Sequence, residues 1–209
     1  ETAAKLNKKA RVHLKIDTGM ERIGVHYYNS ENFFKTAVNC KNIEIEGVFS
    51  HFANSEVDVD LTKQQLERFL NSISFFEKNS IKMPLRHIAN SGGILTLKES
   101  HLDLIRPGIM LYGYYPNPEM EKTIEVKPIL SLKSSVVYFK VVKEGVGVSY
   151  NCRWVSNKQT RVVTIPIGYG DGYSRSLSNK GEVLIRGKRY KIVGSVCMDQ
   201  MMVNIEDGE

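Results

Sequence analysis

The sequence is poor in cysteine and has no long apolar run. Cys40, Cys152 and Cys197 are odd in number and far apart, so they form neither a disulfide framework nor a zinc pattern. No stretch approaches the roughly 20 apolar residues of a membrane-spanning helix, and the opening ETAAKLNKKARVHLKID is not a secretory signal. We therefore expect a soluble protein of a reducing, cytoplasmic compartment, with no membrane segment and no bound metal ion.

The sequence also lacks a concentration of charge of one sign. Its 29 Lys and Arg residues exceed its 23 Asp and Glu residues and give a net charge of +6. These basic residues are scattered, apart from short clusters such as KLNKKAR and RGKRYK. Nucleic-acid binding usually requires basic residues gathered on one face, so it is the weaker interpretation and we predict no such partner. The charge favours solubility and attraction of small anions.

What the sequence does contain is enough apolar residues for a core, 42% of 209. Its first half alternates β-rich runs, VHLKI (12–16), IEIEGVFSHF (43–52) and LRHIAN (85–90), with helical patterns. This alternation predicts a parallel sheet with right-handed crossovers. The helix in DLTKQQLERFLNSISFFEKNS shows a Thr62–Gln65 capping-box pattern, and its apolar residues are expected in the core: Leu66, Phe69, Leu70, Ile73 and Phe76.

From about residue 128 the pattern changes to a two-residue alternation. It runs through SLKSSVVYFKVVKEGVGVSY, TRVVTIPIGYGDGY, GEVLIRGKRYKIVGSV and QMMVNI, with Gly, Asn and Asp at the breaks. Such a pattern indicates short strands joined by turns. We predict an α/β region in residues 1–125 and a separate, mainly antiparallel β domain in residues 126–209, with PNPEMEK as the linker.

Polar residues follow the expected strands of the first half, where parallel sheets bind ligands: His51, Asn90, Ser91 and Arg106. A structural histidine and an N-cap serine are the ordinary interpretations. However, Ser91 precedes two glycines, and the RPG stretch offers the backbone amides of Gly108 and Ile109 beside Arg106. Both loops suit an anion, and together they suggest one phosphate. In LKIDTGMERIG, Lys15, Asp17 and Arg22 could also form an ordinary surface ion network.

The β domain has fewer candidate residues. Tyr150 ends the strand-like GVGVSY, where a tyrosine is usually a packing residue. Asp171 in PIGYGDGYSR could simply form a turn. Cys197 and Met198 in VGSVCMDQMM could be buried structural residues.

Seven stretches taken in order closely resemble the bacterial alanine racemase family: HLKIDTGMERIGV, SHFAN, HIANSGG, IRPGIMLYG, VSY, IPIGYGDGYSR and VGSVCMDQMMV. The resemblance spans nearly the whole chain. It implies a pyridoxal-phosphate enzyme that interconverts L- and D-alanine for cell-wall peptidoglycan. It also implies that residues 1–125 are the C-terminal portion of a (β/α)8 TIM-type barrel, and that the enzyme is a homodimer whose active site is completed by the β domain of the other subunit.

The resemblance also implies roles around the cofactor. Arg106 matches the arginine that donates to the pyridine nitrogen, and His51 matches the histidine that braces this arginine. Ser91, Gly108 and Ile109 match residues that contact the phosphate.

Further roles concern the substrate. Arg22 matches an arginine near the phenolic oxygen of the cofactor that also holds substrate, and Lys15 matches a lysine that is carbamylated in many members and then pairs with Arg22. Tyr150 matches the catalytic tyrosine supplied by the other subunit, and Met198 the residue whose backbone contacts the substrate carboxylate. The remaining matches would line the channel to the site: Tyr169 and Asp171.

These matches have chemical consequences. Arginine keeps its proton, so Arg106 would leave the pyridine nitrogen unprotonated and the ring a weaker electron sink. A less stabilised carbanion is reprotonated promptly, which favours racemisation over transamination. Racemisation needs one base on each face of the planar carbanion. Tyr150 would serve one face if neighbouring cations lower the pKa of its phenol, and the His51 and Arg106 pair is a candidate source of that charge. The second base, the family's Schiff-base lysine, has no counterpart here.

We therefore interpret the chain as a fragment that lacks the N-terminal lysine region and the C-terminal end, and that is inactive alone. Glu21, where glycine is common in the family, could compete for Arg22, and Gly170 stands where alanine is common. A serine racemase or a broad-specificity amino-acid racemase shares most of the motifs. A non-catalytic pyridoxal-phosphate-binding protein is a further alternative, but the β domain argues against it. The last alternative is a basic β-rich interaction module.

Overall fold

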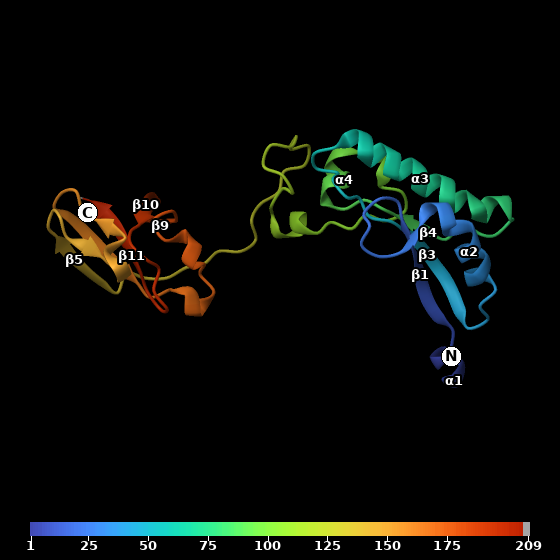
Figure 1. The fold of residues 1–209 in the computed structure, drawn as a ribbon, viewed down its shortest axis with the longest axis horizontal. Helices are drawn as coiled ribbons and strands as arrows, with labels where there is room; N and C mark the ends of the chain where they lie inside the picture. Colours follow the sequence, from blue (N-terminus) through green and yellow to red (C-terminus); the bar gives the residue numbers. More distant parts are fainter. Residues whose placement is uncertain (207–209) are drawn as a thin grey trace. The chain divides into compact units, whose positions relative to one another are not determined.

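The computed structural model describes residues 1–206 and contains two compact units, each described here by itself. The first unit is Glu1–Leu130, and the second begins at Ser131. Figure 1 shows a helix-rich unit at the N-terminal side of the chain and an all-β unit at its C-terminal side.

The first unit contains a four-stranded parallel sheet in the order β2-β1-β3-β4. Its strands are β1 (Ala10–Asp17), β2 (Val25–His26), β3 (Ile43–Phe49) and β4 (Leu85–His87). Its helices are α1 (Thr2–Lys5), α2 (Ser30–Val38), α3 (Val59–Lys78) and α4 (Ser91–Thr96), with short 3-10 turns at Tyr27–Asn29, Lys98–Ser100 and Ile109–Tyr112. The predicted parallel sheet is confirmed. The strands are shorter than predicted, so His51 and Asn90 lie in the loops after β3 and β4.

Helix α3 packs its apolar side into the main core of this unit. Leu66, Phe69, Ile73 and Phe76 are buried there, together with Ile16, Phe34 and Val48 from other elements. The prediction for Leu70 is wrong, because its side chain is 39% exposed at the edge of the apolar stripe. The capping-box prediction is also wrong: the helix begins one turn earlier, and Asp58 caps it by accepting from the amide of Leu61 at 2.9 Å.

The pairing of β1 with β3 contains a β-bulge, which decides which side chains of β3 face the core. Val12 pairs with Ile45, but His13 pairs with Gly47, so Glu46 is an extra residue in β3. After this bulge, Val48 lies with Leu14 on the face that carries the core, whereas Phe49 lies beside Lys15 on the opposite face. The bulge thereby places the polar side chains of β1 together with an aromatic ring.

The second unit contains a five-stranded antiparallel sheet in the order β5-β8-β11-β10-β9 and a two-stranded ribbon of β6 and β7. The strands are β5 (Tyr138–Val142), β6 (Gly147–Val148), β7 (Trp154–Val155), β8 (Thr160–Ile165), β9 (Glu182–Ile185), β10 (Lys188–Ile192) and β11 (Met201–Glu206). Short 3-10 turns lie at Tyr150–Cys152, Tyr169–Asp171 and Arg175–Leu177. Val163, Ile192, Val196, Met201 and Val203 form the centre of its core. The predicted β domain is confirmed.

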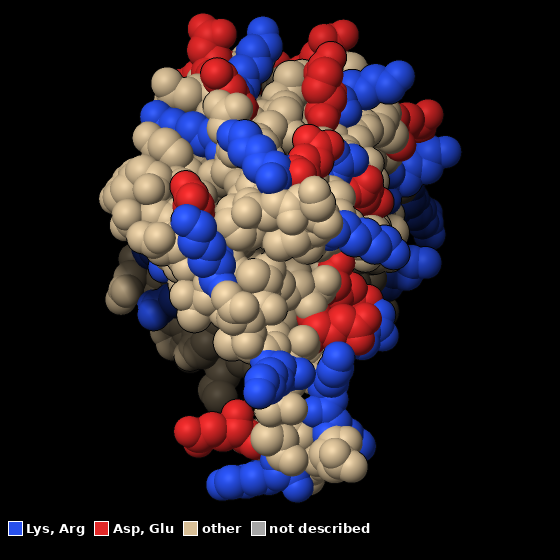
Figure 2. All heavy atoms as spheres, turned by 90° about the vertical axis from the view of Figure 1, so that its right-hand side faces the viewer, with Lys and Arg blue, Asp and Glu red and all other residues tan. Residues whose placement is uncertain are grey.

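Charges on the surface drawn in Figure 2 are mixed, with basic and acidic side chains interspersed. Among residues 1–206, no helix has the length and apolar character that crossing a bilayer requires. The same residues contain no group of three or more His, Cys, Asp or Glu side chains arranged to hold a metal ion.

Candidate functional site

The segment that carries Arg106 is fixed to the end of β4. Arg86 of β4 donates from Nε and Nη2 to the carboxylate of Asp103 at 2.8 and 3.0 Å, and the amide of Arg106 donates to the carbonyl of Ala89 at 3.0 Å. Pro107 then fixes the backbone that follows. These contacts direct the Arg106 side chain across the carboxyl ends of the strands.

The Arg106 guanidinium meets only neutral acceptors. Its Nη2 donates to the carbonyls of Ser50 at 2.7 Å and Ile88 at 3.3 Å, and approaches Nδ1 of His51 at 3.4 Å. Its Nη1 contacts Nδ1 of His87. Among residues 1–206, neither a carboxylate nor any acceptor for its Nε–H is in contact with it. The guanidinium is half-buried, which lowers the pKa of Arg106 from its usual value, but arginine remains protonated under physiological conditions.

Two histidines extend inward from Arg106. Nε2 of His87 lies 2.7 Å from Nδ1 of His13, and Nε2 of His13 faces a carboxylate oxygen of Glu46 at 3.6 Å. Because the guanidinium can only donate, Nδ1 of His87 must accept, and the ring proton of His87 must sit on Nε2. Nδ1 of His13 then accepts from His87, and His13 carries its own proton on the nitrogen that faces Glu46. The charge of Arg106 therefore sets the tautomer of both rings.

Phe49 lies among the cations of this site. Its ring stacks on His87 with centroids 5.0 Å apart, and its centroid is 5.4 Å from Cζ of Arg106 and 5.5 Å from Nζ of Lys15. Burial is the main cause that lowers the pKa of Lys15 to about 8, and the charges of Arg106 and Arg22 lower it further, against the opposing effect of Asp17. The amine of Lys15 is therefore partly neutral near physiological pH.

The carboxylate of Asp17, which lies next to Lys15, is used by the backbone. Oδ1 of Asp17 accepts from the amides of Gly19, Met20 and Glu21 at 2.8, 3.0 and 3.2 Å. Burial opposes ionisation of Asp17, but these hydrogen bonds outweigh it and lower the pKa of its carboxyl. Lys15, Arg22 and Arg106 therefore form a cationic group that favours an anionic ligand.

His51 is not a second cation in this group. Burial, followed by the charge of Arg106, lowers its pKa to about 4. It is consequently neutral at physiological pH and can accept from Arg106. The expectation that His51 and Arg106 both supply positive charge is wrong, because two adjacent cations in a half-buried position would repel each other.

The two loops predicted to bind an anion lie together. The amides of Gly108 and Met110 approach the hydroxyl of Ser91 at 2.8 and 3.4 Å. Asn90, rather than Ser91, caps α4 by accepting from the amide of Gly93 at 2.9 Å, so the Ser91 hydroxyl is not used for capping. A Cβ added at Gly108 would meet only this hydroxyl, at 3.8 Å, so a ligand could approach the backbone there. Ile109 follows with 46% of its side chain exposed.

Arg22 lies exposed in the turn after β1. The neighbouring Glu21 adopts a left-handed backbone (φ 54°), which explains why glycine suits this position. The carboxylate of Glu21 lies 3.6 Å from Nδ1 of His26. Glu21 is thus directed toward His26, and the expected competition for Arg22 is not seen in the contacts.

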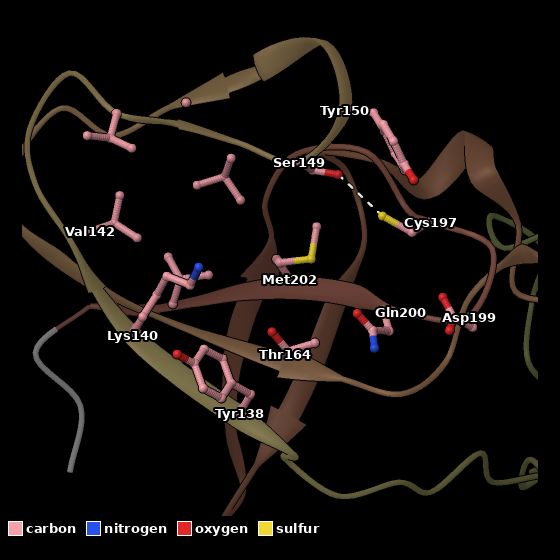
Figure 3. Close-up of a pocket in the computed structure, with 14 residues that line it drawn as sticks. Tyr138, Lys140, Val142, Ser149, Tyr150, Thr164, Cys197, Asp199, Gln200 and Met202 are labelled. Atoms are coloured by element: carbon pink, nitrogen blue, oxygen red, sulfur yellow. Dashed lines mark hydrogen bonds between the residues drawn. The ribbon is translucent and has the colours of Figure 1, made fainter.

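The second unit presents its own group of predicted residues. A cavity of about 590 Å³ is lined by Ser149, Tyr150, Cys197 and Asp199, among others (Figure 3). The amide of Tyr169 donates to the carbonyl of Cys197 at 2.9 Å, and that of Gly170 donates to the carbonyl of Met198 at 2.7 Å.

The predicted side chains of this unit are accessible. Tyr150, Met198 and Tyr169 are 67%, 64% and 47% exposed. Asp171 also has a structural role, since its carboxylate accepts from the amide of Gly168 at 2.9 Å. At Gly170, an added Cβ would lie 2.9 Å from the carbonyl of Met198, which explains glycine there.

Sequence reasoning missed three residues of the first unit: His13, Phe49 and His87. A signal for them was present, because His13 and His87 interrupt apolar strands just as His51 interrupts its own run. Their connection to Arg106 could not be read from the sequence, since it depends on β1 and β4 both pairing with β3, which brings side chains 74 positions apart into contact.

Comparison with known proteins agrees with this arrangement. The family described as "Alanine racemase, N-terminal domain" matches residues 1–116, and "Alanine racemase, C-terminal domain" matches residues 129–209. The chain is 44% identical over 211 residues to "Alanine racemase 2" of Caldanaerobacter subterraneus subsp. tengcongensis, with 100% of this chain and 54% of that protein covered. The chain thus spans about half the length of the relatives it matches.

Solved structures give the same result. The alanine racemase of the D-cycloserine producer Streptomyces lavendulae superposes with a TM-score of 0.89 at 34% identity, covering 98% of this chain and 55% of that one. The enzyme of Bartonella henselae, solved with covalently bound pyridoxal phosphate, superposes with a TM-score of 0.83 at 30% identity, covering 100% and 56%.

Proposed function

The chain belongs to the alanine racemase family, and from this membership we propose that the complete protein interconverts L- and D-alanine with pyridoxal phosphate. The observation that carries the proposal is the half-buried guanidinium of Arg106, which among residues 1–206 has a donor to spare and no carboxylate partner. We assign the reaction to cell-wall precursor supply in the cytoplasm, and we assign the active state to a homodimer.

The residues of the first unit fit the cofactor chemically. Arg106 would donate to its ring nitrogen, braced by the acceptors His51 and His87. The hydroxyl of Ser91 and the amides of Gly108 and Ile109 would hold its phosphate, since hydroxyl and backbone amide donors of this kind bind phosphate oxygens. When bound, pyridoxal phosphate supplies the electron sink that makes the Cα proton of an amino acid removable.

The chain's own residues then select the outcome. Arg106 keeps its proton and cannot protonate the ring nitrogen, so the electron sink stays weak and prompt return of the proton to Cα is favoured. Tyr150 would remove or return this proton on one face of the substrate, from the β domain of the partner subunit. Its exposure is in keeping with a residue that works across a subunit interface.

Two further groups would hold the substrate. Arg22 and the backbone of Met198 would bind its carboxylate, and Tyr169 with Asp171 would line the approach. Lys15 has a lowered pKa of about 8 and is therefore nucleophilic toward carbon dioxide. A carbamate there would replace its positive charge with a negative one and attract Arg22.

The test uses the complete protein with pyridoxal phosphate. D-Alanine formed from L-alanine, and the reverse, is measured by chiral chromatography, with serine as the competing substrate. We expect Tyr150→Phe to lower kcat about 100- to 10,000-fold while the cofactor stays bound, and the exposed Tyr138→Phe to leave kcat unchanged. A wild-type protein that binds the cofactor but interconverts neither amino acid would refute the proposal.

A further inference from the structure

The backbone on both sides of Tyr150 is unusual. Ser149 has φ 66° and ψ −175°, a region that is essentially restricted to glycine, and Asn151 (φ 61°) and Cys152 (φ 46°) are left-handed. Asparagine tolerates the left-handed region, whereas serine rarely adopts the conformation of Ser149. Three strained residues next to an exposed tyrosine persist only if their surroundings hold them.

Two serines supply that support. The hydroxyl of Ser149 donates to the carbonyl of Ser195 at 2.7 Å, and the hydroxyl of Ser195 donates to the carbonyl of Tyr150 at 3.2 Å. Each serine thus holds the backbone of the segment that carries the other, and Ser195 is buried. Figure 3 shows Ser149 reaching toward Cys197 from the turn that carries Tyr150.

The turn also fits closely against the neighbouring loop. A Cβ added at Gly194 would lie 2.6 Å from the carbonyl oxygen of Val148 and 2.8 Å from Cβ of Ser149. The backbone before Ser195 therefore passes directly beside the strained turn. This contact leaves little room for the turn to relax while the two serine bonds persist.

Tyr150 itself has no such support. Its side chain is 67% exposed, and within residues 1–206 its hydroxyl makes no hydrogen bond. The backbone at residues 149–151 therefore sets the direction of the Cα–Cβ bond from which the phenol extends. Glycine would adopt the conformation of residue 149 without strain, so the presence of serine requires a reason, and its hydroxyl contact with Ser195 provides one.

We propose that Ser149 and Ser195 are positioning residues, which clamp a strained turn so that the phenol of Tyr150 points at the reacting carbon. The inference rests on the proposed function, because it assumes that Tyr150 transfers a proton. The serines touch neither substrate nor cofactor in this assignment. Their loss should therefore affect the proton transfer made by Tyr150 and little else.

The experiment compares Ser149→Gly and Ser195→Ala in the complete protein loaded with pyridoxal phosphate. Ser149→Gly removes the hydroxyl and the strain together, so we expect a thermal stability at least equal to wild type. We expect kcat to fall about 10- to 100-fold, with KM changed less than about twofold, because the phenol is misplaced. The primary deuterium isotope effect should rise for the enantiomer whose proton Tyr150 removes and fall for the other, because return of the proton by Tyr150 then limits the rate in that direction. A crystal structure of Ser149→Gly should show the Tyr150 ring reoriented or in several positions.

A matched control is Ser156→Ala, which removes another buried serine hydroxyl of the same unit that donates to the carbonyl of Lys158 instead. It should leave both isotope effects and the Tyr150 ring unchanged. In a Tyr150→Phe background, Ser149→Gly should cause no further loss of kcat, since the group being positioned is already absent.

The outcomes separate the two proposals. If Tyr150→Phe retains wild-type kcat, the role of Tyr150 in the proposed function fails, and the clamp fails with it. If Tyr150→Phe is impaired but both serine variants keep wild-type kcat, isotope effects and ring position, the clamp alone is overturned. A further loss of kcat when Ser149→Gly is added to Tyr150→Phe would overturn the clamp as well. If Ser149→Gly does not fold, the same measurements on Ser195→Ala test the clamp.

Discussion

His87→Gln should make the first unit less sensitive to acid. In the native protein His87 is neutral, because burial, then the charges of Arg106 and His13, lowers its pKa from 6.5 to about 4. In the unfolded chain its pKa returns to its ordinary value, so acid protonates the unfolded state first. A pKa lowered by folding contributes stability above pH 6.5, and this contribution is lost as the pH falls toward 4.

The size of the effect follows from these two pKa values. Between pH 7 and pH 4.5, a full difference between 6.5 and about 4 would remove about 2.4 kcal/mol of the free energy of unfolding. Solvent reaches the hydrogen-bonded pair of His87 and His13, since the side chain of His13 is 31% exposed. Screening by this water reduces the expected loss to about 1–2 kcal/mol. Glutamine keeps both contacts, accepting from Arg106 and donating to His13, but does not titrate.

The assay is urea unfolding followed by circular dichroism at 222 nm, at pH 7 and pH 4.5. The acid-induced loss in the wild type should exceed that in His87→Gln by about 1–2 kcal/mol. His26→Gln is the control, because the side chain of His26 is 41% exposed and contacts Tyr28 and Glu21 at the surface, and it should behave like the wild type. Equal acid-induced losses in the wild type and His87→Gln would refute the reasoning, since His87 could not then be a buried neutral acceptor for Arg106.

Three further predictions concern other features of the first unit. Asp58→Ala should lower the free energy of unfolding by about 1 kcal/mol, and Asp60→Ala by less, because only Asp58 caps α3; equal losses in urea unfolding would contradict this. Gly108→Ala should change stability by less than about 0.5 kcal/mol but weaken pyridoxal phosphate binding in a fluorescence titration, since the methyl group would stand beside the Ser91 hydroxyl; unchanged affinity would remove this loop from the phosphate site. Labelling of Lys15 by fluorodinitrobenzene, followed by peptide mass spectrometry, should have its midpoint at about pH 8, and Arg106→Met should raise this midpoint; a wild-type midpoint near that of an ordinary lysine would contradict the burial argument.

The parallel sheet and the polar residues after its strands could be predicted from the sequence because both depend on local patterns. Apolar runs alternate with helical patterns, and Ser91 and Arg106 directly follow such runs. Burial then brings the strand ends to one edge of the sheet. The same local reasoning identified Tyr150 as the end of a strand, and β6 indeed ends two residues before it.

Other features could not be predicted because they depend on competition between neighbours or on long-range pairing. Thr62 and Gln65 have the right spacing for a capping box, but Asp58 lies one turn earlier and already caps the helix. His51 comes directly after an apolar run, a position that suits a cation in an anion-binding site. Burial and the neighbouring charge of Arg106 nevertheless keep it neutral. Nothing local to either segment indicates that His13 and His87 share a hydrogen bond.

The extra residue in β3 has a consequence for how this protein can change over generations. Glu46 shifts the alternation of the strand, so Ile45 and Val48 serve the core, while Gly47 and Phe49 face His13 and Lys15. Substitutions at the first pair can be selected for packing and those at the second pair for chemistry, with little interference between them. Deleting Glu46 would only remove the bulge and leave both pairs on their present faces, whereas deleting Val48 would bring Phe49 opposite Leu14 and turn its ring toward the core. Single-residue deletions should therefore be tolerated at the bulge and be far rarer after it among functional descendants.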